Sequence, residues 1–95
     1  MNNDLYQFPA TRFISNTPWQ QWRHLFSEVM EIAWALICNN YQHAAAESWD
    51  VKHSAETLQR ILSGHGADIE MARENVISNN MERGYYNQHL SEPPL

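Results

Sequence analysis

The chain of 95 residues contains a single cysteine, Cys38, so no disulfide can form within it. Cys38 lies in an apolar stretch with helical spacing, and we expect it to be a small buried side chain in a reducing cytoplasm. A chain of this length forms one domain with a modest core. Oligomerisation is a reasonable way to complete such a core.

Basic residues are also few, because six Lys and Arg stand against eleven Asp and Glu, for a formal charge of −5. They form no cluster, which argues against a nucleic-acid-binding face. The longest apolar run, residues 32–38, is far too short to cross a membrane. The opening residues, MNNDLYQF, lack the basic and apolar segments of a signal peptide. We therefore expect a cytoplasmic protein with neither nucleic acid nor membrane as a partner.

The chain shows no alternation of apolar and polar residues at the spacing of a β-strand, and the predicted fold class is all-α. Thr17-Pro18 is a helix start signal, with Thr17 as N-cap and Gln20 at the capping-box position. This helix is expected to end near Asn39-Asn40. A second helix is predicted from about residue 42 to residue 62, before a glycine-containing turn, and a third from about residue 67 to residue 84.

These elements predict a single all-α domain over residues 1–95, with three main helices in a bundle that oligomerisation completes. Residues 1–16 form an irregular arm, with one helical turn, that docks on the helical core of residues 17–86. Residues 87–95, which close with Ser-Glu-Pro-Pro-Leu, form a flexible tail.

Two pairs of carboxylates are the clearest functional feature: Glu28-x-x-Glu31 in the first predicted helix and Glu47-x-x-Asp50 in the second. A spacing of three residues places both members of a pair on one side of a helix. Four acids from two consecutive antiparallel helices could meet at one place, where they would repel one another unless a cation were bound. Oxygen-only ligands of this kind suit Mg²⁺ or Mn²⁺ better than zinc.

The predicted helix faces support this interpretation. In the first helix, Glu28 and Glu31 lie on a narrow polar strip beside a broad apolar arc. The arc consists of Trp22, Leu25, Phe26, Val29, Ile32, Ala33, Leu36 and Ile37. In the second helix, Glu47 and Asp50 share the inward face with aliphatic residues, while Lys52, Glu56 and Gln59 point away. Carboxylates among core aliphatics are costly unless paired, protonated or metal-bound, so solvated surface acids are the weaker explanation.

Other residues are candidates for substrate contacts. Asn80 and Arg83 share one stripe of the third helix, and Arg83 could approach a phosphate, although a surface arginine near a helix C-terminus is the alternative. Aromatic side chains could stack on a base, and Trp22 is the best placed, although packing is their commoner role. The other aromatic candidates are Trp19, Trp34, Trp49, Tyr85 and Tyr86. His24 and His53 lie near the acids, where a polar or packing role is commoner than metal binding.

Taken together, these motifs resemble the MazG-like all-α nucleoside triphosphate pyrophosphatases, particularly short bacterial and phage members. The family's ExxE and ExxD motifs, on consecutive helices, match Glu28–Glu31 and Glu47–Asp50, with residues 32–46 between them. The run WDVKHSAETLQRIL resembles the continuation of the ExxD helix, and ENVISNNMERGYY resembles the third-helix signature. The resemblance covers about residues 22–86.

The resemblance implies that the four acids bind Mg²⁺ and that an NTP or dNTP is hydrolysed to NMP and pyrophosphate. It also implies a homodimer or homotetramer, with Asn80 and Arg83 at the substrate. The family's phosphate-contacting lysine, four residues before the arginine, is replaced here by Asn79. Because a lost cation beside a polyphosphate removes charge-assisted contacts, activity could be lowered, altered or absent.

Two alternatives to an active enzyme stay open. A family member that kept the acids but lost turnover would bind nucleotides or a partner as a helical oligomer. A di-iron bundle would instead use Glu-x-x-His pairs, and none is present among the four acids. In an active enzyme, any of the glutamates could accept the proton of the attacking water.

Overall fold

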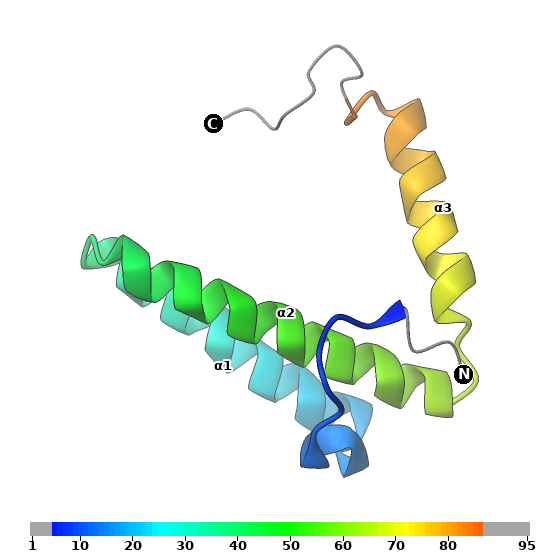
Figure 1. Cartoon of the computed structure of the whole chain (residues 1–95), viewed down its shortest axis with the longest axis horizontal. Helices are drawn as coiled ribbons and strands as arrows, with labels where there is room; N and C mark the ends of the chain where they lie inside the picture. Colours follow the sequence, from blue (N-terminus) through cyan, green and yellow to red (C-terminus); the bar gives the residue numbers. More distant parts are fainter. Residues whose placement is uncertain (1–4, 87–95) are drawn as a thin grey trace.

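The computed structural model describes residues 5–86, which form three α-helices preceded by a short arm (Figure 1). Helix α1 spans Pro18–Ile37, α2 spans Tyr41–Gly64 and α3 spans Ile69–Glu82. The arm contains one 3-10 turn, η2, at Arg12–Ser15. Residues 5–86 include no β-strand, so the all-α prediction is confirmed for this part of the chain. The predicted tail lies outside the described residues.

Each helix begins at a capping side chain, where a loop gives way to apolar residues at helical spacing. At α1, the Thr17 hydroxyl accepts from the Gln20 backbone N–H at 3.1 Å, and the Gln20 side chain accepts from the Thr17 N–H at 2.8 Å. This is the predicted capping box. The side chains of Asn40 and Asp68 cap α2 and α3 by accepting from the backbone N–H of His43 and Met71. Between α1 and α2, Asn39 has a φ of 57°, a conformation that asparagine tolerates better than most residues.

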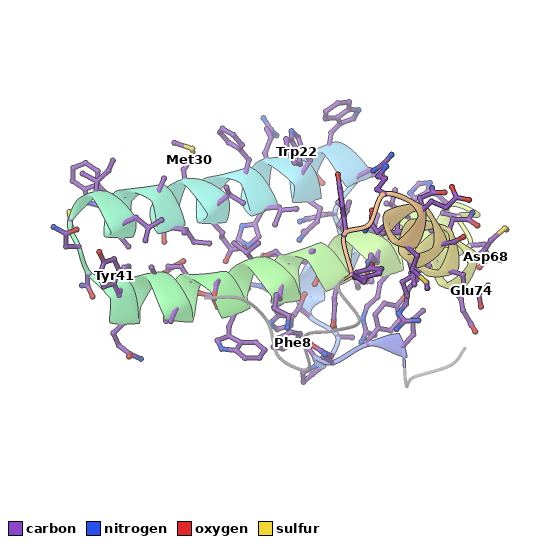
Figure 2. All side chains as sticks on the ribbon, turned by 90° about the horizontal axis from the view of Figure 1, so that it is seen from above. Phe8, Trp22, Met30, Tyr41, Asp68 and Glu74 are labelled. Carbon is purple, nitrogen blue, oxygen red and sulfur yellow. The ribbon has the colours of Figure 1, made fainter. Side chains whose placement is uncertain are left out.

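Helices α1 and α2 form an antiparallel pair whose shared interface is made largely of small and polar side chains (Figures 1 and 2). Gln21 is 1 % exposed and joins the two helices, because its amide nitrogen donates to the backbone carbonyl of Ser54 at 3.1 Å. Its amide oxygen accepts from the side chain of Asn16 at 2.9 Å. The other buried residues of the two helices are Ala35, Ala44, Glu47, Ser54, Thr57 and Ile61.

Most of the apolar arc of α1 does not face α2. Trp22 and Met30 stand on the outer side of α1, away from α2 (Figure 2), and Phe26 is 51 % exposed. Val29, Leu36 and Ile37 are exposed as well. The broad apolar arc is therefore largely uncovered in the single chain, although its members Leu25, Ile32 and Ala33 are half-buried. Cys38, predicted to be buried, is also exposed, because it lies just beyond the last turn of α1.

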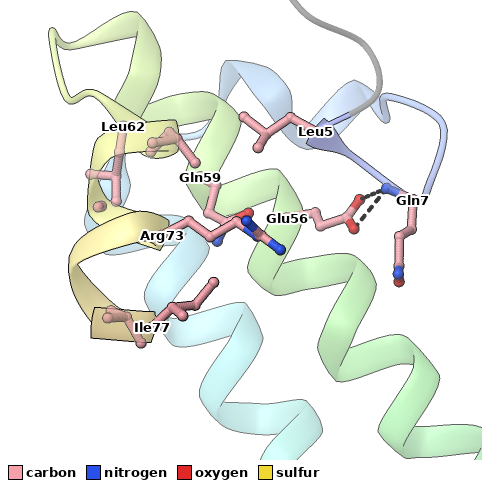
Figure 3. Close-up of a pocket in the computed structure, with 10 residues that line it drawn as sticks. Leu5, Gln7, Glu56, Gln59, Leu62, Arg73 and Ile77 are labelled. Atoms are coloured by element: carbon pink, nitrogen blue, oxygen red, sulfur yellow. Dashed lines mark hydrogen bonds between the residues drawn. The ribbon is translucent and has the colours of Figure 1, made fainter. Parts of the chain in front are cut away.

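Helix α3 projects away from the α1–α2 pair and contains no buried residue (Figure 1). Its side chains Met71, Val76 and Met81 are each more than half exposed. An isolated helix of 14 residues is marginally stable in water, so α3 gains little from the packing seen within the chain. A cavity of about 550 Å³ lies between α3, α2 and the arm, with Arg73 of α3 among its lining residues (Figure 3).

The arm lies across α2 and is held there by side chains of that helix, as the prediction of a docked arm requires. Glu56, predicted to point away from the protein, accepts hydrogen bonds from the backbone of the arm (Figure 3). The prediction for Glu56 is wrong because the helical periodicity of α2 identifies its apolar face but does not show that the arm packs on another face. Within residues 5–86, no helix combines the length and the apolar character needed to cross a membrane.

Candidate functional site

The four acids of the two motifs lie along the seam between α1 and α2. Glu28 and Glu31 come from the middle of α1, and Glu47 and Asp50 come from the first half of α2. The side chains of Glu28 and Glu47 are 18 % and 12 % exposed, so both are largely withdrawn from solvent. Glu31 and Asp50 are exposed. Asp50 therefore departs from the predicted inward placement, because it lies at the edge of the seam rather than among the core aliphatics.

Glu47 and Glu31 are in side-chain contact across the seam. Burial raises the pKa of Glu47, and the negative charge of Glu31 and a side-chain hydrogen bond that protonated Glu47 donates to that residue raise it further. The charge of Asp50 acts in the same direction, while His43 opposes the shift. The Nε2 atom of His43 lies 3.7 Å from Oε1 of Glu47. Ionisation of Glu47 is thus disfavoured by its burial and by the neighbouring acids of both motifs.

Glu28 occupies a second position along the seam, with polar neighbours of its own. The Ser54 hydroxyl donates a short hydrogen bond to Oε1 of Glu28. The Nε2 atom of His24 lies 3.4 Å from the same oxygen. Glu28 and Asp50 both line a cavity of about 190 Å³ between α1, α2 and the arm. One acid of each motif therefore lines this cavity, and Glu31 and Glu47 do not.

The donor chemistry of the four acids fits a hard divalent cation such as Mg²⁺ or Mn²⁺, since all the ligand atoms are oxygens. As placed, however, no three His, Cys, Asp or Glu side chains within residues 5–86 converge closely enough to hold an ion. The acids instead lie as the Glu31–Glu47 pair, with Glu28 and Asp50 beside it. Rotation of the exposed Glu31 and Asp50 side chains would be required to close a coordination sphere.

The predicted substrate-binding residues of α3 are not brought to the acids within one chain. Asn79, Asn80 and Arg83 lie near the end of α3 that is directed away from the α1–α2 pair (Figure 1). Asn80 donates to the hydroxyl of Tyr86 at 3.3 Å, and the Arg83 guanidinium lies 5.9 Å from the centre of the Tyr85 ring.

The predicted base-stacking residue is also remote from the acids. Trp22 is 45 % exposed on the outer side of α1, with its ring centre 6.0 Å from that of Phe26 (Figure 2). The other aromatic candidates, Trp19, Trp34, Trp49, Tyr85 and Tyr86, are exposed too, so none forms part of a core within the chain.

Two residues of the arm border the candidate site, although no sequence pattern predicts them there. Thr11 and Phe13 line the same cavity as Glu28 and Asp50. The arm has neither helical nor strand periodicity, so the face that it presents cannot be read from its spacing.

Comparison of the chain with protein-family models, with curated proteins and with solved structures finds no match.

Proposed function

We propose that this protein is a Mg²⁺-dependent nucleoside triphosphate pyrophosphohydrolase that converts an NTP or dNTP to NMP and pyrophosphate. The observation that carries the proposal is the contact between Glu31 and Glu47 at the seam, with Asp50 beside them and the pKa of Glu47 raised. Neighbouring carboxylates of this kind are stabilised by a divalent cation, and they belong to the two motifs that resemble the MazG-like family.

In this proposal, Glu28, Glu31, Glu47 and Asp50 would hold Mg²⁺, and Mn²⁺ would be an alternative. When bound, the ion would neutralise phosphate charge and lower the pKa of a bound water molecule. Ser54 and His24 orient Glu28 through their contacts with its Oε1 atom. Because these contacts hold Glu28 in place, the exposed Glu31 and Asp50 are the side chains that would adjust to the ion.

We further propose that a homodimer or homotetramer is the active form. The exposed apolar arc of α1 and the exposed apolar side chains of α3, Met71, Val76 and Met81, are the surfaces that another copy would bury. Association of this kind would also allow α3 of one copy to approach the acids of another. Asn80 and Arg83 would then contact the phosphates, which they cannot do within a single chain.

The second candidate is a nucleotide- or partner-binding oligomer that does not turn its ligand over. The residue that favours it is Asn79, which stands where the related enzymes carry a phosphate-contacting lysine. An amide gives a phosphate a weaker contact than an ammonium group does. Nucleotide binding in calorimetry without pyrophosphate release would support this candidate over the enzyme.

Substitution of the acids tests the proposed site. We expect Glu47→Gln and Asp50→Asn to lower Mg²⁺-dependent pyrophosphate release about 100-fold or more, because each removes a negatively charged ligand oxygen. Glu74→Gln is the matched control, since Glu74 is an exposed glutamate of α3 that lies outside the seam (Figure 2). Unimpaired turnover in either seam variant would contradict the assignment.

A further inference from the structure

The arm is fixed to α2 by hydrogen bonds to its backbone. The two carboxylate oxygens of Glu56 accept from the backbone N–H of Gln7 at 3.0 and 2.9 Å, and one of them accepts from the N–H of Phe8 at 3.0 Å (Figure 3). The Nη2 atom of Arg60 donates to the carbonyl oxygen of Phe8 at 2.8 Å. Glu56 and Arg60 are four residues apart and therefore lie on the same side of α2. Two side chains of one helix thus anchor consecutive arm residues.

Side-chain packing strengthens the same anchor. The Phe8 ring stacks on His53 with a centroid distance of 4.6 Å, and Nε2 of His53 lies 3.2 Å from the carbonyl oxygen of Pro9. The guanidinium of Arg60 lies 4.2 Å from the centre of the Tyr6 ring, and Tyr6 is buried. The arm is therefore a defined part of the fold over this stretch.

Beyond the anchor, the η2 turn places two arm residues at the acids. The Thr11 hydroxyl accepts from the backbone N–H of Phe13 at 3.2 Å and so caps the turn. The Phe13 ring stacks on His24, with centroids 5.1 Å apart and an interplanar angle of 29°. Thr11 and Phe13 form one wall of the cavity of about 190 Å³ that Glu28 and Asp50 also line.

We propose that this cavity receives the nucleoside part of the substrate, with Phe13 as a contact residue and Glu56 and Arg60 as positioning residues. The inference rests on the proposed function, because the acids would place the phosphate chain next to the cavity. The cavity holds several times the roughly 30 Å³ of one water, yet it is smaller than the roughly 300–1,000 Å³ of sites that enclose a whole ligand. It therefore takes one ring system of the nucleoside, the base or the sugar, rather than the whole nucleoside.

Apart from the two acids, the lining favours an uncharged, hydroxyl-bearing or aromatic ring. Glu28 and Asp50 are assigned to the ion and the phosphate chain, which leaves Phe13 and the imidazole of His24 as apolar and stacking surface for a ring. The hydroxyl of Thr57, which also lines the cavity, adds a hydrogen-bonding group. A nucleoside carries the complementary hydroxyl groups and ring.

Two probes separate the nucleoside contact from the phosphate contact in calorimetry with Mg²⁺. The α,β-methylene analogues of the four dNTPs carry both parts and resist cleavage, whereas inorganic triphosphate carries only the phosphate chain. We expect wild-type protein to bind the best analogue more tightly than triphosphate. Phe13→Ala should weaken binding of the analogue about tenfold, as loss of an aromatic contact with a base does, and leave triphosphate binding unchanged.

Ile14→Ala is the matched control, because Ile14 follows Phe13 in the same turn, is 44 % exposed and does not line the cavity. Phe13→Leu provides a second variant that keeps an apolar wall and removes the ring. Hydrogen exchange at the amides of Gln7 and Phe8 reports whether the arm remains docked in each variant.

Loss of affinity for the analogue alone, with those amides still protected, supports the inference. Unchanged binding of the analogue, or equal loss for both probes, overturns it and leaves the proposed function standing. Wild-type protein that binds neither probe overturns the inference and the proposed function together.

Discussion

At the residue scale, the buried carboxylate of Glu47 carries a structural cost. Its side chain is only 12 % exposed, and its neighbours across and along the seam include Glu31 and Asp50. Burial and these like charges raise its pKa, so the ionised form is disfavoured in the folded protein. A core built for stability alone would place an uncharged residue here, and the proposed cation site would account for the carboxylate.

The raised pKa of Glu47 predicts a pH-dependent stability in metal-free protein. The folded state holds this proton more tightly than the unfolded chain, in which the pKa lies near the ordinary value of 4.5. The associated stabilisation is present below that value and is lost as the pH rises through the higher pKa of the folded state. Since glutamine cannot ionise, Glu47→Gln should raise the Tm at pH 7 and confer a smaller gain near pH 4.

Thermal unfolding of both proteins in EDTA at the two pH values measures this difference, with Glu74→Gln as a control for loss of an exposed charge. Addition of Mg²⁺ should raise the Tm of wild-type protein at pH 7 and leave that of Glu47→Gln nearly unchanged. A Tm gain for Glu47→Gln that is the same at both pH values would contradict the role assigned to its charge.

At the scale of the elements, the arm depends on a few contacts with α2. Glu56 accepts from two successive backbone N–H groups, so Glu56→Ala leaves both without this acceptor. We expect a loss of about 1.5–3 kcal/mol in the free energy that holds the arm, the usual value for hydrogen bonds to a charged group. Hydrogen exchange at Gln7 and Phe8 should accelerate in this variant and not in Glu74→Ala. Unchanged protection would show that Arg60 and the aromatic contacts suffice.

The helices themselves could be predicted from short-range signals. Thr17 and Gln20 form the expected capping box, and α2 and α3 begin and end close to the residues that spacing and glycines indicate. Such signals depend on neighbours a few residues away in the sequence. The contacts of Glu56 with the arm join residues 48 and 49 positions apart, and no local pattern encodes them.

The candidate site could be predicted only in part, for the same reason. Periodicity grouped Glu28 with Glu31 and Glu47 with Asp50, and the structure places all four along one seam. Periodicity could not show that Asp50 is exposed at the edge or that Ser54 contacts Glu28. It identified the wide apolar arc of α1, but it could not identify what covers that arc.

At the scale of the whole molecule, the single chain leaves much apolar surface uncovered. Trp22, Phe26 and Met30 are each between 45 % and 51 % exposed on α1, and α3 has no buried side chain. Contiguous apolar surface of this kind marks interaction sites in soluble proteins. It supports the proposal that further copies of the chain complete the helical bundle.

Phe26→Glu tests this proposal. We expect wild-type protein to be a dimer or tetramer at micromolar concentration, and the variant to raise the dissociation constant at least about 30-fold, because it places a charge at an aromatic contact of the interface. Light scattering coupled to size-exclusion chromatography measures the masses. Gln42→Glu, which adds a charge at an exposed position of α2, is the control. A monomeric wild-type protein at these concentrations would contradict the proposed assembly.

The products formed from a deoxynucleoside triphosphate in the presence of Mg²⁺ test the central claim most directly. Phosphorus NMR of the reaction distinguishes cleavage between the α and β phosphates from cleavage between the β and γ phosphates. We expect NMP and pyrophosphate, with no product in EDTA, because the seam acids need a cation to hold a phosphate chain. Formation of NDP and orthophosphate, or no turnover with any of the common NTPs and dNTPs, would contradict the claim.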